Sequence, residues 1–186
     1  MLENIMKKIE ENLKVKDRVI IAIDGQAASG KTTLATKIGQ IYDAPIIHMD
    51  DYFLQPHQRV EQRLYEIGGN IDYERFEHEV ISHLNDNVLY IHPFNCQTMS
   101  MEGLKLIQID KVLIIEGAYS MRTSWLKHYD IKVLVTIDSK IQQERMMRRN
   151  PHLYQRFVNE WIPKENEYLS KNQLINIVDV HLHYQD

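Results

Sequence analysis

Apolar residues in this chain gather in short runs, which are separated by longer stretches with helical spacing. Short continuous apolar runs are typical of strands that are buried on both faces of a sheet. The runs VIIAI, VLII and KVLVTI have this character. The stretches that fit a strand, the last of them more weakly, are Val19–Asp24, Pro45–Met49, Val88–His92, Val112–Glu116, Ile131–Ile137 and Ile175–Leu182.

Helical spacing fills most of the gaps and also the start of the chain. The helical patterns cover Leu2–Leu13, Lys31–Tyr42, Tyr73–Leu84, Ser139–Arg149 and His152–Leu169. This alternation predicts an α/β fold with a mainly parallel five-stranded sheet and helices on both faces. Residues 94–110 fit neither pattern, so we expect an irregular insertion or a short hairpin near a substrate site. No repeat or linker divides the chain, and we expect residues 1–186 to form one domain with an N-terminal helix in 1–16.

Composition narrows the classes of function. The formal net charge is −4 and the pI is near 6.1, which argues against general binding of nucleic acid. The single cysteine, Cys96, excludes a disulfide within the chain and fits a reducing cytoplasm. No apolar run is long enough to span a membrane, and the acidic start resembles no export signal. We therefore expect a cytoplasmic protein with no membrane partner, and assembly into a homo-oligomer stays open.

The most informative segment reads GQAASGKT and fits the phosphate-binding pattern G-x-x-x-x-G-K-[ST]. A strand-like run precedes it and a helical pattern follows, as a P-loop requires. Lys31 is expected to reach the β and γ phosphates and Thr32 to bind Mg²⁺, whereas the alternative is a glycine-rich turn with an incidental lysine. The residues expected to contact ATP are Gly25, Gln26, Ala27, Ala28, Ser29, Gly30, Lys31, Thr32 and Thr33.

Acidic residues follow two of the expected strands. Asp50 and Asp51 come after the second strand, at the sheet edge where open α/β sheets bind ligands. A carboxylate there can accept the proton of an attacking hydroxyl or hold a Mg²⁺-bound water, and the alternative is a helix cap or surface loop. Glu116 ends another strand, where a carboxylate can polarise Mg²⁺-bound water.

Four segments together resemble the uridine kinase and phosphoribulokinase branch of the P-loop kinases, and most closely the bacterial uridine kinase-like proteins. They read GQAASGKT, MDDYF, GGNIDYERF and LIIEGAY, and the resemblance runs from about Arg18 to Asp179. It implies a P-loop NTPase fold and ATP-dependent phosphoryl transfer to a hydroxyl of a small metabolite. It also implies that Asp50 is the general base and that Glu116 lies near the metal.

The same resemblance suggests contacts to the phosphate acceptor. Asp51 stands where many members have a small hydroxyl residue, and Tyr52 begins an aromatic pair in reversed order. Asp72 is expected to bind sugar hydroxyls, although it also fits a cap of the helix that starts near Tyr73. Phe94 and Gln97 correspond to a segment with aromatic and polar contacts to the acceptor.

Residues 140–170 resemble the lid and the helix that follows it. The run Gln142–Asn150 carries three arginines, of which Arg145 and Arg149 share one helical face. By resemblance these two contact phosphate in a closing lid, whereas the alternative is a solvated basic face. The sequence RRNP departs from the uridine kinase pattern at this point, which affects the identity of the acceptor more than the chemistry.

Uridine and cytidine are the first acceptors that the resemblance suggests. Pantothenate, nicotinamide riboside and sugar phosphates stay open, and an anionic acceptor requires basic residues such as Arg63 or Arg75. A different class is a non-catalytic ATP-binding regulatory module. The chain lacks the Asn-Lys-x-Asp motif of guanine-reading switches, and Lys31 and Asp50 are both present, so the expected function is that of a kinase.

Overall fold

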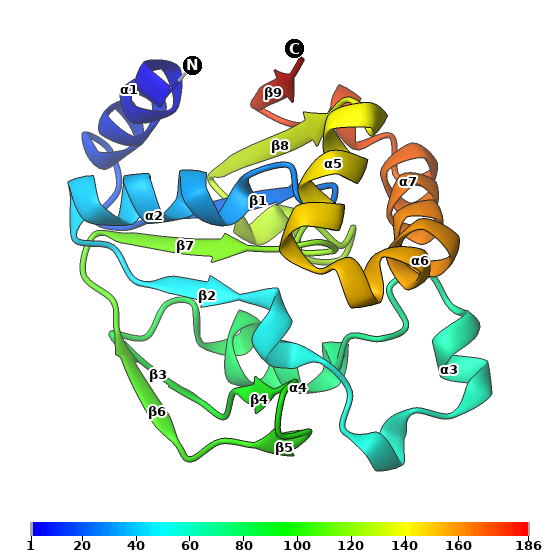
Figure 1. Cartoon of the computed structure of the whole chain (residues 1–186). Helices are drawn as coiled ribbons and strands as arrows, with labels where there is room; N and C mark the ends of the chain where they lie inside the picture. Colours follow the sequence, from blue (N-terminus) through cyan, green and yellow to red (C-terminus); the bar gives the residue numbers. More distant parts are fainter. Residues whose placement is uncertain (1, 186) are drawn as a thin grey trace.

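The computed structural model describes residues 2–185 and contains a central sheet of five parallel strands (Figure 1). The strands lie in the order β2-β7-β1-β8-β9, and every neighbouring pair is parallel. This confirms the predicted α/β fold and its five-stranded sheet. The bounds of these strands are β1 Val19–Gly25, β2 Ile46–His48, β7 Val112–Glu116, β8 Ile131–Ile137 and β9 Val180–Tyr184.

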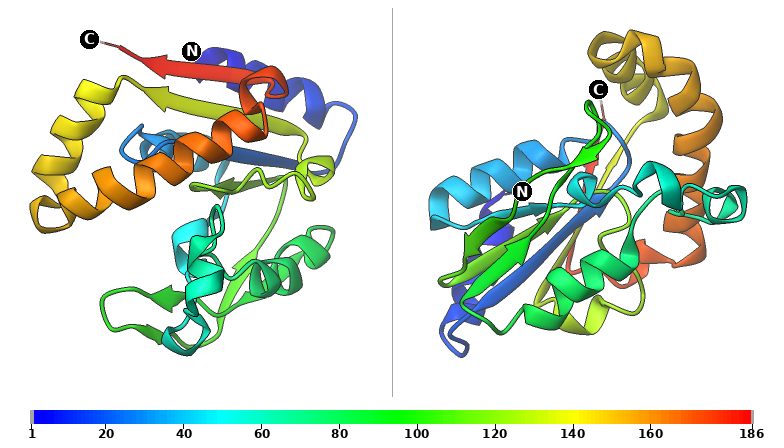
Figure 2. Two further views of the ribbon diagram at one scale, coloured as in Figure 1. Left: turned by 90° about the vertical axis from the view of Figure 1, so that its right-hand side faces the viewer. Right: turned by 90° about the horizontal axis from the view of Figure 1, so that it is seen from below.

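Alternate residues of the buried strands face two separate apolar cores. Ile21 and Ile23 of β1 lie in one core with Leu34 and Ile38. Ile20 of the same strand points to the other core, which also holds residues of α4 and α7. Figures 1 and 2 show α1 and α2 on one side of the sheet and α7 on the other. The helix bounds are α1 Leu2–Leu13, α2 Lys31–Tyr42, α3 Glu61–Tyr65, α4 Tyr73–Glu79, α5 Ser139–Arg149, α6 Tyr154–Arg156 and α7 Ile162–Lys171.

The segment between α4 and β7 leaves the central sheet. Strand β3 (Val88–Ile91) forms as predicted, but it pairs antiparallel with β6 (Lys105–Gln108). A second small hairpin joins β4 (Phe94–Asn95) and β5 (Ser100–Met101). The expectation of a hairpin in residues 94–110 is therefore confirmed, and β6 adds a strand that the sequence pattern did not show.

Several predicted elements have different bounds from those expected. The helix predicted over Tyr73–Leu84 ends at Glu79, and Ile81–His83 forms a 3₁₀ turn instead. The last strand begins only at Val180, because Leu174–Asn176 forms a 3₁₀ turn instead. The helix predicted from His152 to Leu169 exists over that range but contains a π turn at Phe157–Trp161. Pro163 follows this turn and has no N–H to donate, so the regular helical ladder is interrupted near it. In residues 2–185, no helix has the length and hydrophobicity needed to cross a membrane.

Candidate nucleotide and acceptor site

The predicted P-loop connects the end of β1 to the start of α2. Gly25 has φ +142°, and a Cβ there would lie 1.8 Å from the carbonyl oxygen of Val135 on the neighbouring strand. Gly30 has φ +100° just before α2. Only glycine adopts these backbone conformations without strain. The first glycine of the motif is thus required by the close approach of β8, and the second by the turn into the helix.

Several amide groups of the P-loop are free to bind an anion. Among the described residues, no protein acceptor receives a hydrogen bond from the backbone N–H groups of Ala28, Gly30, Lys31, Thr32 and Thr33. The Lys31 ammonium donates to the carbonyl oxygens of Gly25 and Gln26, at 2.9 Å each. Unpaired amides at a helix N-terminus, together with a lysine, are the donor set that binds phosphate groups. This geometry fits the nucleotide phosphates that the motif predicts.

Glu116 lies beside the first turn of α2, as its place at the end of β7 predicted. It is 5% exposed, and its Oε1 accepts a hydrogen bond from the Thr32 hydroxyl at 3.1 Å. The same oxygen lies 2.6 Å from Nδ1 of His48, and this bond raises the pKa of the imidazole. The hydroxyl and the carboxylate are oxygen ligands of the kind that Mg²⁺ binds together with phosphates and waters. In residues 2–185 no cluster of three His, Cys, Asp or Glu side chains supplies a separate metal site.

His48 was not singled out from the sequence. Its register opposite Glu116 in the β2–β7 ladder explains the contact, and its place two residues before Asp50 was the only available signal. The pair shows that β2 and β7 deliver polar groups to the same edge of the sheet.

Asp50 lies in the 3₁₀ turn Met49–Tyr52 that follows β2. The residue is exposed to solvent. Nearby protein atoms still partly desolvate its carboxyl group, and this desolvation raises the pKa of the carboxyl. The positive charges of Lys31, His48 and Arg149 lower this pKa, whereas the negative charge of Glu116 raises it further. The structure therefore brings Asp50 into the electrostatic neighbourhood of the P-loop lysine. Its role as a base stays a prediction.

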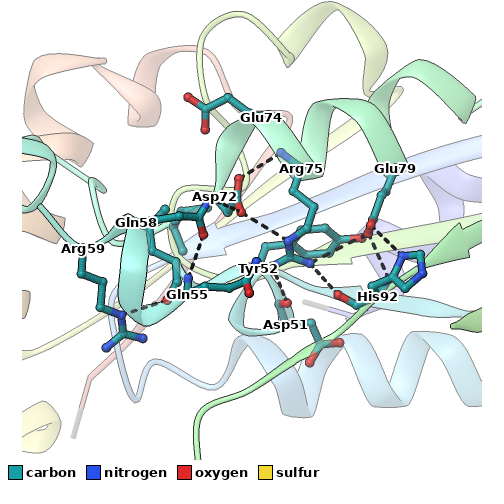
Figure 3. A network of polar contacts seen from close by, with 12 residues as sticks. Asp51, Tyr52, Gln55, Gln58, Arg59, Asp72, Glu74, Arg75, Glu79 and His92 are labelled. Carbon is teal, nitrogen blue, oxygen red and sulfur yellow. Dashed lines mark hydrogen bonds and ion pairs between the residues drawn. The ribbon is translucent and has the colours of Figure 1, made fainter. Parts of the chain in front are cut away.

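Of the two possibilities for Asp72, the structure shows the helix cap. One carboxylate oxygen accepts from the backbone N–H of Arg75 at 3.1 Å, which caps α4. The other accepts from Nε2 of Gln58 at 3.0 Å, and the whole residue is 3% exposed. Figure 3 shows this carboxylate enclosed by its own partners. Sugar binding by Asp72 would require these partners to move.

Two further acceptor candidates lie in the apolar core. Tyr52 is fully buried, packs edge-on against Phe76 and donates its hydroxyl to Glu79 at 3.1 Å. Phe94 is 3% exposed. We correct the expectation of direct acceptor contact for both, because a hidden ring offers almost no surface to a ligand. The sequence pattern did not reveal this because aromatic residues beside a strand suit both a core and a binding site.

The remaining acceptor candidates keep accessible side chains. Asp51 is half-buried, and desolvation raises the pKa of its carboxyl. Gln97 lies in the β4–β5 turn, where it is exposed and its backbone N–H donates to the side chain of Asn95 at 2.9 Å. Both remain predictions for acceptor contact.

The arginines of α5 separate into different environments. Arg145 donates to the carbonyl oxygen of Ala28 at 3.1 Å, and its guanidinium lies 5.7 Å from the ring centroid of Tyr184. Arg149 is exposed at the end of the helix, and its charge acts on Asp50. The structure thus joins α5 to the P-loop through Arg145, whereas the positive charge of Arg149 lowers the pKa of Asp50 without a hydrogen bond between them.

Asp24 is a buried acid at the site that the motif does not include. It is fully buried and accepts hydrogen bonds from the backbone N–H groups of Gly25, Tyr119 and Met121, at 2.6, 3.1 and 2.8 Å. The Tyr168 hydroxyl of α7 donates to it at 2.8 Å. Four donors compensate for the burial of this carboxylate, although desolvation still raises its pKa. Asp24 therefore ties the end of β1 to α7 and to the loop after β7.

Comparisons with known proteins agree with this fold. No family model matches the chain. Uridine-cytidine kinase D of Dictyostelium discoideum is 32% identical over 122 residues, which cover 63% of this chain and 23% of that protein. The match thus spans about a quarter of the length of that relative.

Solved structures share the fold over nearly the whole chain. A protein of Bacillus stearothermophilus described as a possible uridine kinase has a TM-score of 0.71 at 22% identity, with 97% of each chain covered. YFH7 of Saccharomyces cerevisiae, described as a candidate P-loop containing kinase with a circular permutation, has a TM-score of 0.64 at 14% identity. It covers 100% of this chain and 98% of its own. These likenesses support the resemblance that the four motifs carried: the chain has the fold of these solved structures, and 63% of it is similar in sequence to a uridine-cytidine kinase.

Proposed function

We propose that this protein is a Mg²⁺·ATP-dependent kinase that transfers the γ-phosphoryl group to a hydroxyl of a small, uncharged metabolite. The observation that supports the proposal is a P-loop with unpaired amides, whose Lys31 is close enough for its charge to lower the pKa of Asp50. The likeness to a uridine-cytidine kinase supports the same reaction class. Uridine and cytidine are the acceptors to test first.

In this proposal the carboxylate of Asp50 accepts the proton of the acceptor hydroxyl as its oxygen attacks the γ-phosphorus. Burial raises the pKa of this carboxyl, which makes the ionised form a stronger base near neutral pH. Lys31 and Arg149 place positive charge where the phosphoryl group and the leaving ADP carry negative charge. Thr32 and Glu116 would hold Mg²⁺, which neutralises charge on the bridging phosphate oxygens.

The environment of two arginines favours an uncharged acceptor. Arg75 donates to Asp72 and to the carbonyl oxygens of His92 and Asp51, the latter two at 2.7 and 3.0 Å (Figure 3). Its guanidinium also lies 4.3 Å from the ring centroid of Tyr52. These contacts leave Arg75 little capacity for an anionic group.

Arg63, the second basic candidate, is engaged in the same way. It donates to both carboxylate oxygens of Glu74, at 2.8 and 2.6 Å, and to the carbonyl oxygen of Ile71 at 3.2 Å. The acidic pair Asp50 and Asp51 adds negative charge on the acceptor side of the P-loop. A phosphorylated or carboxylated acceptor would meet repulsion there, whereas a neutral polyol such as a nucleoside would not.

The test is ADP release from Mg²⁺·ATP with uridine, cytidine, other nucleosides, pantothenate, nicotinamide riboside, sugars and sugar phosphates. We expect turnover with a neutral acceptor, and we expect Asp50→Asn to lower kcat by about 10²-fold or more, as loss of a general base does. Asp51→Asn is the matched control, because it removes a neighbouring carboxylate with a smaller expected effect. ATP binding without turnover on any acceptor would refute the kinase proposal. Turnover with the anionic acceptors alone would refute the neutral class.

A further inference from the structure

The first half of the P-loop is held from outside by side chains of α5 and α7. The N–H of Ala27 donates to Oε2 of Glu165 at 2.7 Å. The carbonyl oxygen of the same residue accepts from Nε2 of Gln142 at 2.9 Å. Next along the loop, the carbonyl oxygen of Ala28 accepts from Arg145. Every one of these partners lies more than 100 residues further along the chain.

The side chain of Gln26 adds a second link to α7. Its amide nitrogen donates to Asn166 at 2.8 Å, and its amide oxygen accepts from the backbone N–H of Ile137 at 3.0 Å. Adjacent residues Glu165 and Asn166 therefore contact adjacent residues of the P-loop. Helix α7 is joined to the loop by two neighbouring hydrogen bonds, and to β1 by Tyr168.

These hydrogen bonds determine which backbone N–H groups of the P-loop can donate to a phosphate. In a trans peptide the C=O and the following N–H point in opposite directions. Because Gln142 holds the carbonyl of Ala27, the N–H of Ala28 points away from α5, and this N–H is one of the unpaired donors. The N–H of Ala27 is already bonded to a carboxylate, so a phosphate oxygen cannot use it while Glu165 stays in place.

A buried carboxylate is a costly choice for a purely structural contact. Glu165 is 7% exposed, and desolvation raises its pKa to about 7. The charge of Lys31 lowers this pKa, whereas Asp24 and Asp50 raise it. A neutral side chain of similar volume would fill the same space without this penalty. Its Oε2 is nonetheless held on the Ala27 N–H, next to the unpaired amide of Ala28. This placement of an acceptor oxygen points to a role in the geometry of the phosphate site.

We propose that Glu165 is a positioning residue, which holds the Ala27 N–H so that the P-loop offers its unpaired amides, those of Ala28 and of residues 30–33, to the phosphates. Together with Asn166, it also couples the loop to α7. The inference rests on the proposed function, because it concerns the site that binds the phosphates of ATP.

Two substitutions of nearly equal size separate positioning from packing. Glu165→Gln retains an oxygen acceptor for the Ala27 N–H and removes the charge, whereas Glu165→Met retains the volume and removes the acceptor. Glu167→Met is the control, since Glu167 is exposed on the same helix and pairs with Lys171. The readouts are the Kd of Mg²⁺·ATP, the KM and kcat of turnover, and hydrogen exchange of the P-loop amides. Circular dichroism shows that each variant is folded.

We expect Glu165→Met to raise the Kd and KM for ATP about tenfold, the net value of one hydrogen bond, and to speed exchange of the P-loop amides. Glu165→Gln should stay within about threefold of the wild type, and Glu167→Met should be unchanged. Equal behaviour of the Gln and Met variants at position 165, whether both normal or both impaired, would overturn the inference. Wild-type protein that binds no ATP would refute the proposed function instead, and the exchange rates would then still decide whether Glu165 positions the loop.

Discussion

The buried carboxyl of Glu165 makes the stability of this protein depend on pH in a defined direction. Its ordinary pKa is 4.5, and burial raises the pKa to about 7 in the folded protein. The folded state therefore binds this proton more tightly than the unfolded state does. It follows that the contribution of Glu165 to the free energy of unfolding is greatest below pH 4.5 and falls as the pH rises to about 7.

The size of the effect follows from the two pKa values. One pKa unit corresponds to about 1.4 kcal/mol, so the full difference corresponds to about 3 kcal/mol. Between pH 5 and pH 8 the contribution of Glu165 should fall by about 2.5 kcal/mol. Asp24, Asp50 and His48 also have raised pKa values, so they produce a trend of the same sign in the wild type.

The comparison with Glu165→Gln isolates the contribution of one residue, because the other groups are present in both proteins. Urea unfolding followed by circular dichroism at pH 5, 6, 7 and 8 gives the free energy of unfolding at each pH. We expect the wild type to lose stability relative to the variant by about 2.5 kcal/mol across this range. A difference that stays constant within about 0.5 kcal/mol would refute the assignment of a raised pKa to this carboxyl.

Two further substitutions test the backbone and the polar network. Gly25→Ala should lower the free energy of unfolding by about 3 kcal/mol or more, because its Cβ would lie 1.8 Å from a carbonyl oxygen of β8. Gly103→Ala is its control, with nothing within 4 Å of the added atom, and equal thermal shifts would contradict the reasoning. Arg75→Lys should cost about 2 kcal/mol in urea unfolding, because one ammonium cannot replace a buried fork with several acceptors. Arg156→Lys, at an exposed pair with Glu160, should be near neutral, and an equally small effect at Arg75 would show that its network contributes little.

The parts of the fold that were predicted are those that local pattern determines. The bounds of α1, α2, α5, β7 and β8 match the apolar periods in the sequence residue for residue. Helices α1 and α2 pack one apolar face, and β7 and β8 two, against the cores, and their sequences show that directly. Helix α5 buries only Gln142 and Met146. The pairing of β3 could not be predicted in this way, because a strand of this length suits a parallel sheet and a hairpin equally. Its partner β6 is largely exposed and alternates too weakly to be seen.

In the candidate site, too, the residues next to buried strands could be predicted from the sequence, whereas contacts between distant residues could not. The P-loop and the acids after β2 and β7 are read from residues adjacent in sequence to buried strands. Their meeting follows from the sheet order, because β1, β7 and β2 are neighbours and parallel strands end at the same edge. The contacts of Glu165 and Asp24 with distant backbone amides have no local signature. A glutamate on a helix is usually solvated, and only the packing of α7 against the P-loop shows that this one is not.

The same division explains why the chemistry of the site is better determined than its acceptor. In the proposed function, phosphate binding depends on backbone amides of the P-loop, which starts at Gly25 against β8 and is held further along by α5 and α7. The residues that we propose for the acceptor side belong to the segment after Asp50 and to the β4–β5 hairpin, both of which lie outside the central sheet. In that region Asp72 and Tyr52 are buried, and their side chains form hydrogen bonds within the protein. In the proposed function, we therefore expect acceptor specificity to come from residues that keep accessible side chains there, such as Asp51 and Gln97.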